Sequence, residues 1–196
     1  MGAYSPAQVV TEAVFAKVME RVILPTVEGM AAEGHPYIGF LYAGLMIDSD
    51  GNPSVIEYNC RFGDPETQPI MHRLRGNLGT LCLAALDGRL DDMTANWDPR
   101  PAVGVVLAAG GYPGSYEKGY EIKGLDADWP ATTKVFHAGT QQKGDSVVTQ
   151  GGRVLCISAL GDSIADAIAA AYAGVDQISW KGMVCRRDIG WRAIDR

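Results

Sequence analysis

The sequence predicts an α+β protein in two parts: a first half with helices and two strands, and a β-rich second half with one helix. Near the N-terminus apolar residues recur every three to four positions, which is typical of a helix. After residue 101, short apolar runs separated by Gly, Pro and Asp are typical of strands. The polar segment 96–101, with two prolines, separates these textures and predicts domains 1–97 and 98–196.

The first element is a helix expected over 5–33. Ser5 and Pro6 provide one possible start, with Ser as N-cap and Pro at the first helical position, and Thr11 provides another. Pro25 should kink or interrupt this helix, because proline lacks an N–H and its ring crowds the preceding turn.

Two strands and two more helical segments follow. The apolar run Gly39–Ile47 predicts a strand, the turn-forming segment Asp48–Asn52 reverses the chain, and Ser54–Arg61 predicts the returning strand. Asp64–Pro65 has the composition of a helix start, with Asp64 as the cap. A further helix is expected over Leu78–Leu86.

For the second half, the sequence predicts a series of strands and one helix, which follows the last of these strands. Ser163 is the expected cap of that helix, whose apolar face includes Ile164 and Val175. The expected strands are Val103–Ala109, Tyr120–Lys123, Lys134–Ala138, Ser146–Thr149 and Arg153–Leu160.

Composition limits the partners. The chain has 196 residues, 47% apolar and 20% charged, with a net charge of −6 and no long basic stripe. Nucleic acid and anionic membranes are therefore not expected partners. The four cysteines form no C-x-x-C pair, and no run of 18 apolar residues occurs, so we expect a cytoplasmic protein with reduced thiols.

Segment 55–66, VIEYNCRFGDPE, raises the functional question. Side chains alternate between the faces of a strand, so Glu57, Asn59 and Arg61 should share one face at steps of roughly 6 to 7 Å. Carboxylate and amide oxygens suit Mg²⁺, and a guanidinium suits a phosphate or acyl phosphate. Alternation alone favours the simpler interpretation, a strand with one solvated face, because half-exposed strands are common. The expected helix start at Asp64 favours a site, because helix N-termini attract anions.

The motifs extend this interpretation. The runs GFLYAGLMID and VIEYNCRFGDPETQPIM closely resemble the glycinamide ribonucleotide synthetases (phosphoribosylamine–glycine ligases) of the ATP-grasp superfamily. MGAYSPA, AAGGYPG, KVFHAGT and DIGWRAI match the same family in the same order. The resemblance implies the C-terminal part of an ATP-grasp domain, followed by a small β-rich, barrel-sandwich-like domain.

The resemblance also assigns roles. It implies that Glu57 and Asn59 are Mg²⁺ or Mn²⁺ ligands that hold the ATP phosphates, and that Arg61 lies near the transferring phosphoryl group. Asp64 is our choice for a substrate contact. The strand before Asp48 carries no carboxylate, unlike many superfamily members, so a third ligand is expected from Asp48, water or phosphate.

The implied activity is that of an ATP-dependent carboxylate–amine ligase. ATP would phosphorylate glycine, and 5-phosphoribosylamine would attack the glycyl phosphate to give glycinamide ribonucleotide in purine biosynthesis. Family members are about twice as long, so we expect a C-terminal fragment that is inactive without the N-terminal portion. The alternatives are another ATP-grasp ligase and a folded module without catalytic activity.

Overall fold

The structure, a computed structural model, describes residues 1–194 and divides into two compact units. The sheet unit comprises Met1–Pro6, Asp64–Leu74 and Trp97 onward. The hairpin unit comprises Ala7–Gly63 and Arg75–Asn96. The units follow spatial contacts and do not coincide with a single cut after residue 97, because two segments of the first half fold with the second half.

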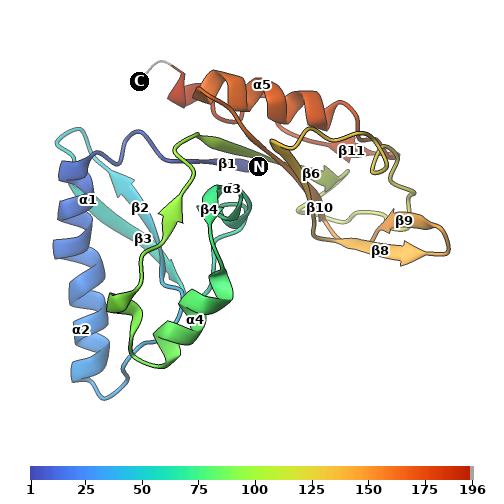
Figure 1. Cartoon of the computed structure of the whole chain (residues 1–196). Coiled ribbons are helices and arrows are strands. Elements are labelled where there is room, and N and C mark those ends of the chain that lie inside the picture. Colours follow the sequence, from blue (N-terminus) through green and yellow to red (C-terminus); the bar gives the residue numbers. More distant parts are fainter. Residues whose placement is uncertain (195–196) are drawn as a thin grey trace. The chain divides into compact units, whose positions relative to one another are not determined.

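An antiparallel sheet forms the centre of the sheet unit, in the order β1-β6-β10-β7, with β11 also paired to β6 (Figure 1). A separate hairpin joins β8 to β9. The strands are β1 (Gly2–Ser5), β6 (Ala102–Ala109), β7 (Thr133–His137), β8 (Thr140–Lys143), β9 (Ser146–Thr149), β10 (Arg153–Leu160) and β11 (Met183–Val184).

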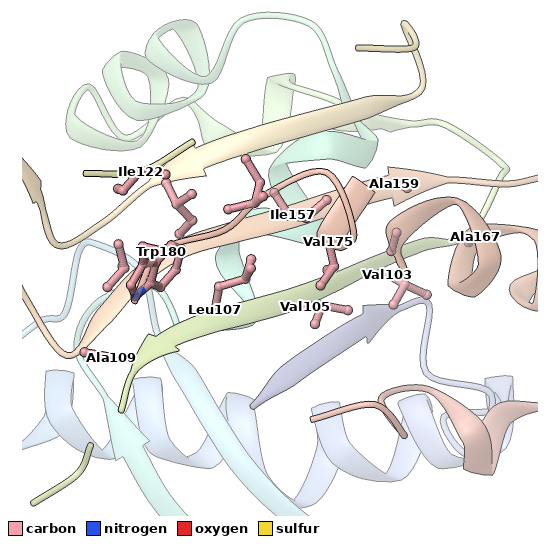
Figure 2. Close-up of a cluster of buried hydrophobic side chains, with 14 residues drawn as sticks. Val103, Val105, Leu107, Ala109, Ile122, Ile157, Ala159, Ala167, Val175 and Trp180 are labelled. Atoms are coloured by element: carbon pink, nitrogen blue, oxygen red, sulfur yellow. The ribbon is translucent and has the colours of Figure 1, made fainter. Parts of the chain in front are cut away.

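Helices cover both faces of this sheet. Strand β6 is buried at all its positions, which requires a partner on each side. Helix α5 (Ile164–Val175) packs on one face, where Figure 2 shows Val175 beside Val103 and Val105. Helix α3 (Thr67–Arg73) packs against β6 and β10 through the residues of the other face. There, a Cβ on Gly104 would lie 3.1 Å from Cδ of Pro69, so the glycine permits this close approach.

The sequence predicted α5 correctly from its capping residue and its apolar face. Ser163 is its N-cap and forms a capping box with Asp166, in which each side chain accepts from the other residue's backbone N–H. The observed bounds agree with the expected helix. The short helix η3 (Trp191–Ala193) was not predicted.

Arg73, the last residue of α3, joins three chain segments of the sheet unit. Its guanidinium donates to Oγ of Ser5 at 2.8 Å, to the carbonyl of Asp98 at 3.0 Å and to the carbonyl of Arg100 at 3.1 Å. Asp98 is buried, and its carboxylate binds the side chain of Arg100 through both oxygens. Burial lowers the pKa of Arg73, partly offset by the charge of Asp98.

Arg73→Met should therefore destabilise the sheet unit by about 2 kcal/mol, because it leaves partly buried acceptors without a charged donor. Urea unfolding followed by tryptophan fluorescence would measure this, since all four tryptophans belong to this unit. Arg187→Met is the matched control, because Arg187 forms an exposed ion pair with Asp176 in the same unit. An equal loss of stability in both variants would contradict the role given to Arg73.

The hairpin unit combines an interrupted helix with the strand pair β2 (Tyr42–Ile47) and β3 (Pro53–Asn59) (Figure 1). The helical stretch consists of α1 (Glu12–Val18), the π-helix η1 (Met19–Ile23) and α2 (Leu24–Ala32). The expected interruption at Pro25 is therefore present as a π-helical segment that ends just before it. Helix α4 (Leu78–Leu86) has its predicted bounds, and the 3₁₀-helix η2 (Leu90–Asp92) follows it.

The turn between β2 and β3 has the predicted chemistry. Oδ1 of Asp48 accepts from the backbone N–H groups of Asp50 and Asn52 at 2.9 and 2.8 Å. These bonds, led by that from Asn52, lower the pKa of Asp48. Lys17 on α1 donates to the carbonyl of Asp50 at 2.9 Å and so ties the helix to the turn.

Burial differs between the units. The buried apolar side chains described in the hairpin unit are Val14, Val22 and Ala84, whereas the large apolar cluster lies in the sheet unit (Figure 2). Several large side chains of the hairpin unit are strongly exposed: Phe15, Ile38, Met46, Ile56, Leu83 and Leu86. In the part of the chain that the structure describes, no helix has the length and apolar character needed to cross a membrane.

The start of the first helix was predicted wrongly. Residues Gly2–Ser5 form β1, which pairs with β6, and α1 begins at Glu12 with Thr11 as its N-cap. The residue before a proline is disfavoured in the helical region, so Ser5 before Pro6 suits a strand. The rival start at Thr11 is confirmed.

The other differences concern short elements. No continuous strand forms over Tyr120–Lys123, where Glu121 and Lys123 make isolated bridges. Polar β8 was missed because its sequence, TQQK, lacks an apolar alternation. Strands β4 (Leu74–Arg75) and β5 (Asn96–Trp97), which pair with each other, were also missed.

Candidate functional site

Glu57 and Asn59 lie together on β3. They are two positions apart on the same face, and Nδ2 of Asn59 donates to Oε1 of Glu57 at 3.1 Å. Glu57 is exposed and Asn59 is half-buried, so both reach solvent. The predicted pair of oxygen-bearing side chains is therefore brought together in the structure.

A register shift between β2 and β3 affects the direction of the Glu57 and Asn59 side chains. Glu57 pairs with Gly44 and Val55 pairs with Leu45, so one extra residue of β3, Ile56, lies opposite a single step of β2. Such bulges twist a strand and redirect the neighbouring side chains. A Cβ on Gly44 would lie 3.2 Å from Cγ of Glu57, so the glycine leaves room for the carboxylate side chain.

Asp48 does not join the site as a third ligand. Its oxygens accept hydrogen bonds within the turn, as described above. In the strand register Glu57 pairs with Gly44, four residues before Asp48, which corresponds to about 13 Å along the strand. Of the three sources named for a third ligand, Asp48 is therefore the one that this geometry disfavours, and water and phosphate remain.

Arg61 lies beyond the strand that was expected to carry it. Strand β3 ends at Asn59, so strand alternation does not place the guanidinium beside Glu57. Nη1 of Arg61 donates to the carbonyl of Phe62 at 2.7 Å. The Phe62 ring stacks on Phe40 with 3.8 Å between centroids, which orders the backbone that Arg61 contacts. The side chain of Arg61 is exposed.

Asp64 belongs to the sheet unit and has a partner there. Nη1 of Arg153, at the start of β10, lies 3.3 Å from Oδ1 of Asp64 and donates to the main-chain carbonyl of Asp64 at 2.9 Å. The expectation that Asp64 caps a helix is wrong. Helix α3 begins at Thr67, Glu66 occupies the N-cap position without a side-chain cap, and the helix has only 7 residues.

Cys156, two residues after Val154 on β10, is buried and unreactive in character. Burial and the nearby charge of Asp64 raise the pKa of its thiol to about 12. The thiol therefore stays protonated at neutral pH and is a poor nucleophile. Cys156 therefore packs against the region of Gly104, and we assign it no catalytic role.

Glu57 and Asn59 are the candidate ligands for a divalent cation. Across residues 1–194, no group of three or more His, Cys, Asp or Glu side chains is placed to hold a metal ion. Glu57 and Asn59 offer two hard oxygen ligands if the amide of Asn59 turns its oxygen toward the carboxylate. That set fits Mg²⁺, which usually keeps waters and phosphate oxygens and takes only one or two protein carboxylates.

A separate surface pocket of about 400 Å³ lies in the sheet unit. Lys181, Glu117 and Tyr120 are among its lining residues. None of the four predicted site residues lines it, so it adds nothing to the predicted site.

Sequence reasoning missed two residues of this region. Gly44 lies inside the apolar run that predicts a strand, and a glycine inside a strand often marks a close approach. Arg153 was included as the first residue of a strand. Its contact with Asp64 joins positions 89 apart, and no local pattern signals it.

Comparison with known proteins identifies the family. The family model "Phosphoribosylglycinamide synthetase, ATP-grasp (A) domain" matches residues 1–67, and the model "Phosphoribosylglycinamide synthetase, C domain" matches residues 102–192. The chain belongs to the phosphoribosylglycinamide synthetase family. Its matched parts are two of the family's domains, in the order that the sequence motifs indicated.

Relatives of this family match along the whole chain. The phosphoribosylamine–glycine ligase of Vibrio cholerae is 65% identical over 196 residues, which cover 100% of this chain and 46% of the relative. The crystal structure of phosphoribosylamine–glycine ligase from Thermotoga maritima superposes with a TM-score of 0.79 at 37% identity, covering 96% of this chain and 46% of that one. The chain thus spans about half the length of the relatives it matches, and it corresponds to their C-terminal portion.

A more distant match supports the fold alone. The biotin carboxylase domain of 2-oxoglutarate carboxylase from Hydrogenobacter thermophilus has a TM-score of 0.61 at 13% identity, covering 100% of this chain and 42% of that one. The fold of this chain is therefore shared with a biotin carboxylase domain of low sequence identity.

Proposed function

We propose that this chain supplies the metal-binding part of a phosphoribosylamine–glycine ligase that joins glycine to 5-phosphoribosylamine with ATP. The observation that carries the proposal is the pairing of Glu57 with Asn59 on a bulged strand, within the segment that matches the family's ATP-grasp domain. The products are glycinamide ribonucleotide, ADP and phosphate. The name of the Vibrio cholerae relative supports this choice over other ATP-grasp ligases.

The chemistry needs an activated carboxylate. Oxide is a poor leaving group, so the carboxylate of glycine first takes the γ-phosphoryl group of ATP, which releases ADP. The amine of 5-phosphoribosylamine then attacks the acyl carbon of glycyl phosphate, phosphate leaves, and the amine gives up a proton. The protein contributes positioning and charge stabilisation.

Residue roles follow from this chemistry. Glu57 and Asn59 would hold Mg²⁺ or Mn²⁺, which neutralises phosphate charge when bound. Arg61 would stabilise the negative charge that develops during phosphoryl transfer, because its exposed guanidinium has one backbone partner at Phe62 and a fork of donors. Asp64 would contact a substrate by accepting hydrogen bonds from an amine.

Completion by an N-terminal portion is part of the proposal. The chain covers 46% of its relatives' length, and the hairpin unit exposes Ile56, Met46 and Leu86 at 65%, 62% and 71%. Apolar exposure of that extent suits a surface that another part of the enzyme covers. The expected cytoplasmic location is supported by free cysteines at positions 60, 82, 156 and 185.

A fusion enzyme tests the function. The N-terminal portion of the Vibrio cholerae relative would be joined ahead of this chain, and ADP release would be followed with ATP, magnesium, glycine and 5-phosphoribosylamine. We expect glycine-dependent turnover by the fusion and none by the 196-residue chain alone, because the chain covers 46% of the relative's length and, under this proposal, the remaining part supplies the cradle for the β- and γ-phosphates. Turnover with bicarbonate in place of glycine would indicate another ATP-grasp ligase. A folded fusion without turnover would favour a module without catalytic activity.

Glu57→Gln in the fusion should weaken magnesium binding during ADP release, because it keeps the side-chain shape and removes a negative oxygen ligand. We expect the magnesium concentration for half-maximal rate to rise about 10-fold, which corresponds to about 1.4 kcal/mol of metal affinity. The side chain is exposed, so far-UV circular dichroism melting should be unchanged. An unchanged magnesium titration would reject the metal role.

Arg61→Ala in the fusion should lower kcat more than it raises the KM for glycine. The charge that Arg61 meets grows during phosphoryl transfer, so the loss should resemble removal of an oxyanion-hole donor, roughly 10²- to 10³-fold in kcat. Steady-state kinetics with varied glycine would measure both constants. If KM alone changed, Arg61 would bind the ground state and the assigned role would be wrong.

A further inference from the structure

We infer that Arg153 is a positioning residue, which holds Asp64 and the segment leading into α3 in one orientation within the sheet unit. The geometric part of this inference stands on contacts within the sheet unit. Its meaning for substrate binding rests on the proposed function, in which Asp64 contacts a substrate.

One guanidinium nitrogen fixes Asp64 at two atoms. Nη1 of Arg153 donates to the main-chain carbonyl of Asp64 at 2.9 Å and lies 3.3 Å from its Oδ1. Because both acceptors belong to one residue, the contact sets the side chain of Asp64 relative to its own backbone. The Asp64 side chain is 49% exposed, so the carboxylate can still meet a ligand.

A bulge in β10 presents Arg153. Arg153 pairs with Ala108 and Leu155 pairs with Leu107, so Val154 is an extra residue in the register. Bulges occur next to active sites, where they redirect a side chain. Arg153 and Glu57 thus share a local feature: each lies next to a bulge, in β10 and β3 respectively.

Glycines fix the backbone beneath Arg153. The carbonyl of Arg153 accepts from the N–H of Gly139 at 2.9 Å. A Cβ on Gly139 would lie 2.7 Å from that carbonyl oxygen and 2.5 Å from Cα of Gly151, so only glycine permits this approach. The next residue, Val154, is fully buried. The side chain of Arg153 therefore projects from a rigid base.

The Arg153–Asp64 ion pair is better suited to orienting Asp64 than to stabilising the fold. Arg153 and Asp64 are 33% and 49% exposed, and ion pairs of that exposure contribute about 0–1 kcal/mol to folding. A contact that stabilises the fold so little, yet joins two segments 89 positions apart, is suited to setting the geometry of a short segment. Small displacements of a substrate contact are costly to catalysis.

The first test uses the 196-residue chain and needs no activity. Arg153→Gln should make amide hydrogen exchange in residues 64–68 about 3-fold faster or more, while β6 and β10 stay protected. Arg89→Gln is the control, because Arg89 forms an exposed pair with Asp87 at 2.9 Å in the hairpin unit. Arg153→Lys, which keeps the charge and loses the fork, should give an intermediate rate. Exchange equal to that of the unsubstituted chain would overturn the inference.

The second test measures coupling in the fusion enzyme. Arg153→Gln should lower kcat/KM about 10-fold, mainly through KM for glycine or 5-phosphoribosylamine, because a displaced contact weakens substrate binding. If Arg153 acts through Asp64, the double variant with Asp64→Asn should fall no more than about 2-fold below Asp64→Asn alone. Arg89→Gln should retain the parental constants.

The outcomes separate the two proposals. Losses that multiply in the double variant would overturn the inference, because Arg153 would then act on the substrate independently of Asp64. A fall in unfolding temperature with unchanged kinetics would also overturn it, since Arg153 would be a purely structural residue. An inactive parental fusion, or an Asp64→Asn variant with parental constants, would reject the proposed function, and the exchange experiment would still decide whether Arg153 positions Asp64.

Discussion

Strand β6 must be covered on both faces, because its 8 residues are all apolar or glycine and all buried. Helix α5, from the second half of the chain, covers one face, and α3 covers the other. Helix α3 comes from the first half of the chain, so this requirement draws Asp64–Leu74 into the sheet unit. Arg73 then fixes the end of α3 to Ser5 and to the chain entering β6. The burial of one strand thus determines which site residues belong to which unit.

Glu57 and Arg153 both lie beside register shifts in their strands. Glu57 follows the bulge in β3, and Arg153 precedes the bulge in β10. Each also depends on a glycine that allows close approach, Gly44 for the carboxylate and Gly139 for the backbone of Arg153. A regular strand would aim these side chains by strict alternation, whereas an extra residue changes the direction locally. The two bulges therefore help to determine where the polar side chains of Glu57 and Arg153 point.

Elements with local causes could be predicted from the sequence. The helix over Leu78–Leu86 and the capped helix at Ser163 have their expected bounds, because caps and apolar periodicity act within a few residues. Strand β1 could not be recognised, since its pairing with β6 joins positions about 100 apart and its sequence is short. The Glu57–Asn59 pair was predicted because strand alternation is local, and the Arg153–Asp64 contact was not, because it depends on the tertiary fold. Arg61 was misplaced for a simpler reason: the strand ends two residues earlier than alternation suggested.

The two-ligand set constrains how a metal would bind under the proposed function. Glu57 supplies one negative charge and Asn59 a neutral oxygen, so the pair offers little to an ion that dehydrates reluctantly. Phosphate oxygens of ATP would have to provide further ligands and most of the negative charge. Asp48 cannot supply them, because its oxygens are held within the turn at the other end of the hairpin. Under this proposal metal affinity should therefore depend on bound nucleotide, and Glu57 and Asn59 would place a metal–nucleotide complex rather than hold a metal ion on their own.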